Sequence, residues 1–165
     1  MSDSEAPEPS PDDEGVFVVV AAIDSSNLAS HVVEYAARVT RRTWPNAQLH
    51  VVHVFRSGRF DRPTQAGLRT EDLLADAQSY LDHHVRMARR QCASPVTGHL
   101  AEGDPVDEIV KRARSLSADL LIVGTQDPVG IEKFLLGSIA EKVAKRAPCS
   151  VLMVRRKQRP YIKVS

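Results

Sequence analysis

Two continuous apolar runs, VFVVVAAI at 16–23 and ADLLIVG at 118–124, constrain the fold of this chain more than any other feature. A strand with one exposed face alternates apolar and polar residues, whereas a strand buried on both faces is an unbroken run rich in Val, Ile and Leu. Both runs therefore predict central strands of a parallel sheet that is covered by helices on its two faces.

Strand-like and helix-like segments alternate along the whole chain. Apolar residues recur at helical spacing from 29 to about 43, from 70 to about 90, from 105 onwards and up to about 147, and shorter strands are predicted at 49–55, 95–102 and 149–155. The order β-α-β-α-β-α-β-α-β requires parallel strands and right-handed crossovers. We expect an α/β fold, a single doubly wound domain with helices on both faces of the sheet.

Two details of the helices can be checked in a structure. Asp104-Pro105 predicts a helix start in which Asp104 is the N-cap and Pro105 lies in the first turn. The helix that begins at Thr70 is expected to turn six residues towards the sheet, namely Leu73, Leu74, Ala77, Leu81, His84 and Ala88.

Charge separates the two ends of the chain from its body. Residues 1–14 hold six of the 21 acidic residues and three prolines, which predicts a disordered acidic tail. The domain is predicted over 15–156 and a basic tail over 157–165, since the last eleven residues hold five of the 22 basic ones. The nearly neutral body argues against a dedicated nucleic-acid site, because phosphate contacts dominate that kind of affinity.

Several other classes of function are not expected. No apolar run approaches the roughly 18 residues of a membrane span, and the N-terminus does not resemble a secretory signal. The cysteines and histidines have no metal-ligand spacing: Cys92, Cys149, His50, His53, His83 and His84. His50 and His53 both lie in the strand predicted at 49–55, and we expect them to serve in packing or capping. Since both cysteines read as ordinary thiols and no metal spacing occurs, we predict a cytoplasmic protein with no metal site. No serine and histidine form a nucleophile-base pattern, so we predict no catalytic residue.

A ligand crevice is predicted where the two apolar runs end, at Asp24 and Gly124. In doubly wound sheets, ligands bind beyond the carboxyl ends of the strands where the strand order reverses. The stretch GTQDPVGIEKFLLGS at 124–138 begins there, and Gly137-Ser138 precedes a helix whose free N–H groups attract anions. The same Ser138 also opens an S-x-x-E capping box, which needs no ligand.

From Val16 to Arg156 the chain resembles the universal stress protein family. Nucleotide-binding members of that family carry G-x2-G-x9-G-[ST] between the fourth strand and the fourth helix. Gly124 matches the first glycine, and Gly137-Ser138 matches the end of the motif. The segments AAIDSS, GDPVDEIV and FLLGSIAEKVAKRAPCSVLMV are also typical of the family and occur in the same order.

The resemblance implies a five-stranded sheet in the order 3-2-1-4-5, ATP or another adenine nucleotide as ligand, and a homodimer. The dimer would form through the last strand, at Val151, Leu152, Met153 and Val154. Asp24 would lie by the adenosine, Val54 beside the adenine and Gly124 at the ribose. The phosphates would be held by the second motif glycine and by Gly137, Ser138 and Ile139.

Two positions depart from the family pattern: Asp127 replaces the second motif glycine, and Ala22 stands where a proline is common. A carboxylate about 4 Å from a phosphate costs roughly 4 kcal/mol at an effective dielectric of 20. The Cβ of Asp127 disfavours positive φ, and Pro128 removes an N–H donor. Magnesium held by the carboxylate would offset the charge. We therefore expect a compromised ATP site, or none, and a smaller penalty for a smaller nucleotide.

Three functions remain open from the sequence. The first is a stress-response module that binds an adenine nucleotide, supported by Asp24, Gly124 and Ser138. The second is a nucleotide-independent dimer that acts through unknown protein partners, supported by Asp127-Pro128. The third is an enzyme that hydrolyses ATP or phosphorylates itself.

The polar segment over 56–69 is long enough to shape a site.

Overall fold

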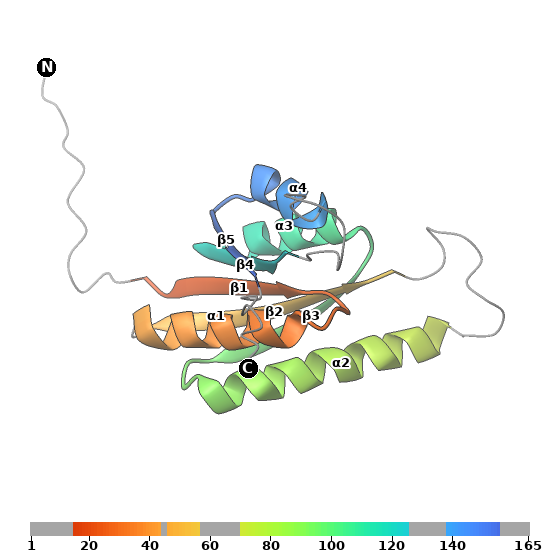
Figure 1. Cartoon of the computed structure of the whole chain (residues 1–165), viewed down its shortest axis with the longest axis horizontal. Coiled ribbons are helices and arrows are strands. Elements are labelled where there is room, and N and C mark those ends of the chain that lie inside the picture. Colours follow the sequence, from red (N-terminus) through yellow and green to blue (C-terminus); the bar gives the residue numbers. More distant parts are fainter. Residues whose placement is uncertain (1–14, 44–45, 57–69, 126–137, 156–165) are drawn as a thin grey trace, which may run out of the picture.

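The computed structural model describes residues 15–43, 46–56, 70–125 and 138–155 (Figure 1). Strands and helices alternate along these residues in the predicted order. They are β1 (Phe17–Ile23), α1 (Ala29–Thr43), β2 (Ala47–Phe55), α2 (Thr70–Gln91), β3 (Val96–Glu102), α3 (Pro105–Ser115), β4 (Leu120–Gly124), α4 (Ser138–Arg146) and β5 (Ser150–Val154). The predicted elements are confirmed, with ends that differ by one or two residues.

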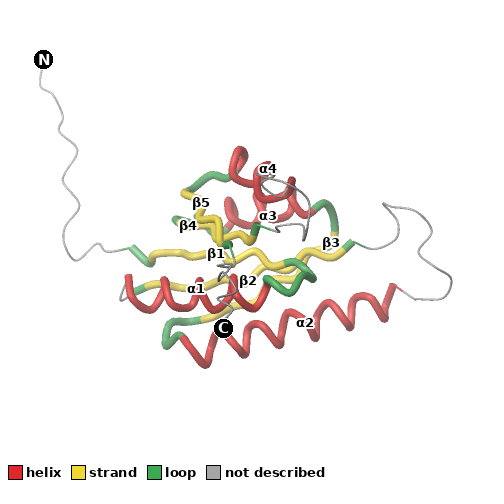
Figure 2. Tube along the Cα trace, viewed as in Figure 1, coloured by secondary structure: helices red, strands yellow, loops and turns green. Residues whose placement is uncertain are grey.

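All strand pairs are parallel, and the sheet has the order β3-β2-β1-β4-β5. Helices α1 and α2 cover one face, while α3 and α4 cover the other (Figure 2). Successive residues of β1 enter the two different cores: Val19 and Ala21 pack under α1 and α2, and Val20 and Ala22 under α3 and α4. This two-sided burial explains why the strand is an unbroken apolar run.

The ladder between β1 and β4 ends one residue before the last residue of each strand. Its last pair is Ala22 with Val123, so Ile23 has a register partner in β2, His53, but none in β4. From here the chain leaves β1 for α1 on one face, whereas the helix after β4 lies on the other. The strand order reverses at this point, and the two strand ends separate there.

The start of α3 confirms the predicted cap. The Asp104 carboxylate accepts hydrogen bonds from the backbone N–H groups of Val106 at 2.9 Å and Asp107 at 3.2 Å. One predicted inner-face residue of α2 is wrong: Leu74 is 47% exposed, whereas Ala77, Leu81 and His84 are buried. The first turns of α2 extend past the sheet, so a residue with the correct spacing has no sheet beneath it (Figure 1).

In the part of the chain that the structure describes, no helix is both long enough and apolar enough to cross a bilayer. The predicted tails and most of the 56–69 segment lie outside the described residues.

Candidate functional site

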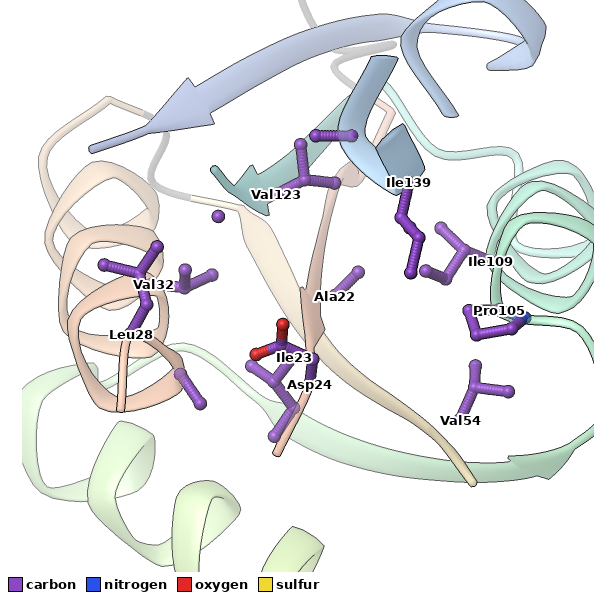
Figure 3. Close-up of a pocket in the computed structure, with 13 residues that line it drawn as sticks. Ala22, Ile23, Asp24, Leu28, Val32, Val54, Pro105, Ile109, Val123 and Ile139 are labelled. Carbon is purple, nitrogen blue, oxygen red and sulfur yellow. The ribbon is translucent and has the colours of Figure 1, made fainter. Parts of the chain in front are cut away.

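A pocket of about 160 Å³ opens where the ends of β1 and β4 separate (Figure 3). Residues that the sequence predicts for the site line it from four elements: Ala22, Asp24, Val54, Gly124 and Ile139. Asp127 and Gly137 lie outside the described residues. Ser138 begins α4, and its side chain is not described. The structure thus brings together five of the eight residues that the sequence predicts for the site.

The pocket has two apolar walls with a carboxylate between them (Figure 3). Leu28, in the turn before α1, and Val32 of α1 form one wall, and the other consists of Val54, Pro105, Ile109 and Ile139. Asp24 carries the only charged side chain among the lining residues that the structure describes. An apolar slot with few polar groups is the usual form of a small-molecule site.

Gly124 lies against α1. A Cβ atom at this position would come within 2.8 Å of Leu28 Cδ2 and 2.9 Å of Val32 Cγ2. The family resemblance places this glycine at the ribose of a bound nucleotide. The structure adds a second reason, because a side chain here would force Leu28 or Val32 to move.

The Asp24 side chain is held by the turn that begins α1. Its Oδ1 accepts hydrogen bonds from the Ser26 backbone N–H at 3.1 Å and from the Ser26 hydroxyl at 2.5 Å. The Ser26 Oγ accepts in turn from the Leu28 N–H at 3.2 Å. This hydrogen-bonded turn directs the carboxylate into the pocket mouth (Figure 3).

Two side chains beside the pocket were given no site role from the sequence. The Tyr80 hydroxyl of α2 donates to the Asp24 backbone oxygen at 2.7 Å, and His53 Nδ1 lies 3.1 Å from the Ile23 oxygen. The only signal in the sequence was the spacing of Tyr80, one helical turn before the inward-facing His84. That spacing shows a shared face but does not identify the acceptor.

A second histidine contact lies on the α3 side of the sheet. His50 Nδ1 and His99 Nε2 are 2.9 Å apart across β2 and β3, so the packing role expected for His50 has a partner that the sequence interpretation missed. Burial, the nearby Arg112 and His50 lower the pKa of His99 to about 4. No group of three or more His, Cys, Asp or Glu residues is arranged to hold a metal ion in the described ranges.

Comparison with known proteins gives a consistent result for sequence and structure. Residues 17–155 match the sequence profile of the universal stress protein family. The chain is 30% identical over 141 residues to a universal stress protein of Methanocaldococcus jannaschii, covering 84% of this chain and 81% of that protein.

Solved structures of similar proteins share the fold. A universal stress protein in complex with cAMP is 27% identical, with a TM-score of 0.63 and coverage of 84% of this chain and 96% of that one. A universal stress protein from Archaeoglobus fulgidus is 25% identical, with a TM-score of 0.63 and coverage of 83% and 92%.

Proposed function

Because the chain belongs to the universal stress protein family, we propose that it is a regulatory module that binds an adenine nucleotide between β1 and β4. The observation that carries this proposal is the pocket itself. It lies at the reversal of strand order, has two apolar walls and contains one carboxylate, Asp24. A similar protein has been solved in complex with cAMP, which supports the same ligand class here.

The chemistry of the walls suggests how such a ligand would lie. The flat base fits the apolar wall that includes Val54 and Ile109, where burial of its faces is favourable. Asp24, which accepts hydrogen bonds, suits the hydroxyl groups of the sugar. The phosphate would then point towards the N-terminus of α4, where free N–H groups and the helix dipole attract anions.

The sequence of the motif limits the number of phosphates. Asp127 stands where nucleotide-binding relatives have a glycine, and its charge opposes each further phosphate that comes near it. We therefore propose a nucleotide with a single phosphate as the preferred ligand. ATP would bind more weakly, and better with magnesium than without it.

We propose a cytoplasmic homodimer as the working form. The strand β5 is at one edge of the sheet, and its apolar residues Val151, Leu152 and Met153 are only partly buried within one copy. Pairing of two such edges would cover them and satisfy backbone groups that an edge strand leaves open. In this proposal the protein acts by binding and not by turnover.

Calorimetric titration with AMP, cAMP and ATP, the last with and without magnesium, tests the ligand. We expect micromolar binding of a monophosphate, weaker binding of ATP, and at least a tenfold gain in ATP affinity for Asp127→Gly. Asp127→Asn removes the charge and keeps the Cβ, so it separates repulsion from backbone strain. If neither the natural protein nor Asp127→Gly binds any of these nucleotides, the pocket is not a nucleotide site. The nucleotide-independent dimer would then be the better account.

A further inference from the structure

Two successive carbonyl groups, that of Ile23 at the end of β1 and that of Asp24 just after it, accept hydrogen bonds from ring side chains of other elements. The Ile23 oxygen accepts from His53 of β2 at 3.1 Å, and the Asp24 oxygen accepts from Tyr80 of α2 at 2.7 Å. Both carbonyls lie beyond the last β1–β4 pair, Ala22 with Val123. The rings therefore hold the chain where the backbone ladder on the pocket side has ended.

These rings form a packed group, the ring cluster, which consists of His53, Tyr80 and His84. The ring centroids are 5.0 Å apart for His53 and Tyr80, and 4.4 Å apart for Tyr80 and His84. His53 is 4% exposed and His84 3%. His84 is fixed in turn, with Nδ1 2.9 Å from the Tyr80 oxygen and Nε2 3.4 Å from Ser30 Oγ. The cluster thus joins α1, α2 and the β1 and β2 ends.

The protons of the cluster follow from its acceptors. A carbonyl oxygen only accepts, so Nδ1 carries the hydrogen on both His53 and His84, and a neutral His84 accepts from Ser30 at Nε2. Burial lowers the pKa of His84 despite its hydrogen bond to the backbone. Burial and the Asp24 charge raise the pKa of Tyr80, so its hydroxyl keeps the proton that it donates.

Buried polar side chains need partners in any fold, and a purely structural role would explain why the histidines are satisfied. It does not explain the direction of the Tyr80 hydroxyl. This group bonds the backbone of Asp24, whose side chain is the only charged one among the described residues of the pocket. The Asp24 carboxylate accepts from both donors of Ser26, so Tyr80 holds the backbone of the same turn whose next residues fix where the carboxylate points.

We propose that Tyr80 is a positioning residue of the pocket: its hydroxyl, supported by the two imidazoles, holds the β1 end so that Asp24 faces the ligand. The role in ligand binding rests on the proposed nucleotide function. The role in holding the turn does not, and the two can be measured separately.

Hydrogen exchange without ligand tests the turn, using the natural protein, Tyr80→Phe and Tyr35→Phe. Tyr35 is a matched control, since it lies on α1 and packs partly buried against the same core. We expect the amides of Ser26, Leu28 and Ala29 to exchange about three- to tenfold faster in Tyr80→Phe, the value of one ordinary hydrogen bond. Tyr35→Phe should leave them unchanged. Unchanged exchange in Tyr80→Phe, or an equal increase throughout the chain, would overturn the proposal.

AMP titration of Asp24→Asn, Tyr80→Phe and the double variant tests the route to the ligand. Tyr80→Phe should weaken AMP binding about three- to tenfold in the natural background and little when Asp24 is already replaced. Additive losses would show that Tyr80 does not act through Asp24, and would overturn its positioning role. If the natural protein binds no nucleotide while exchange at the turn still responds, the nucleotide function fails and the hold of Tyr80 on the turn stands.

Discussion

Gly124 and Leu28 are in such close contact that a Cβ on the glycine would lie 2.8 Å from the Leu28 Cδ2. The first glycine of the motif therefore has a structural role that does not depend on a ligand. A chain that had lost nucleotide binding would still need glycine here to keep α1 packed over β4. The presence of Gly124 is thus weaker support for a nucleotide than the shape of the pocket beside it.

Gly124→Ala should lower the free energy of unfolding by about 1–3 kcal/mol, the usual cost of overpacking. Urea denaturation measures it. Gly15→Ala is the control, because a Cβ there meets nothing within 4 Å and stability should change by no more than about 0.5 kcal/mol. The double variant Gly124→Ala/Leu28→Ala should lose less stability than the sum of the losses of the two single variants, because the smaller side chain at 28 makes room for the new Cβ. Full additivity would show that the close contact with Leu28 is not the cause.

The cap of α3 gives a second stability prediction. Asp104→Ala removes the acceptor of two N–H groups and the Arg56 ion pair at 3.3 Å, so we expect a loss of about 1 kcal/mol. Asp107→Ala, in the same helix, removes an exposed pair with Arg146 and should cost less than about 1 kcal/mol. Thermal unfolding of the two variants compares them directly. Equal losses would mean that capping does not dominate at Asp104.

Much of the architecture could be predicted from local sequence patterns. Unbroken and periodic apolar runs indicated the helices and all strands except β3, whose pattern is weak, and the ends of two runs located the crevice at Asp24 and Gly124. The strand order came from the family resemblance and is confirmed. The partners of the site could not be predicted, since Tyr80 and Asp24 are 56 residues apart and His50 and His99 are 49 apart. Only the packing of α2 and the strand register brings such pairs together.

Acid should destabilise the protein through the histidine pair on the α3 side. The folded pKa of His99 is about 4, below the ordinary 6.5, because of burial, Arg112 and His50. The unfolded chain therefore binds more protons between these values, so this contribution is complete above pH 6.5 and is lost as pH falls towards 4. If the whole pKa difference contributed, the free energy of unfolding would fall by about 3 kcal/mol. His99 is partly exposed, so we expect a smaller loss of about 1–2 kcal/mol.

Urea denaturation at pH 7.5 and pH 5 measures this loss. His99→Gln should remove much of the difference between the two pH values, whereas His31→Gln, on α1, should keep it. His50 and His84 also have lowered pKa values and change stability in the same direction, so some pH dependence will remain in His99→Gln. A difference of the same size in the natural protein and in His99→Gln would contradict the assignment.

The β5 edge leads to a prediction about assembly. If two copies pair through β5, the natural protein should sediment at about twice its 18.2 kDa monomer mass. Met153→Arg places a charge among the partly buried apolar residues of that edge, and burial of an unpaired charge is unfavourable. The dimer of this variant should therefore dissociate at a higher protein concentration than the natural dimer. Thr97→Arg adds the same side chain at an exposed position of β3, the opposite edge strand, and should leave the dimer intact. Circular dichroism of both variants establishes that the fold is retained. A natural protein that sediments as a monomer, or a dimer broken by Thr97→Arg and not by Met153→Arg, would rule out assembly through β5.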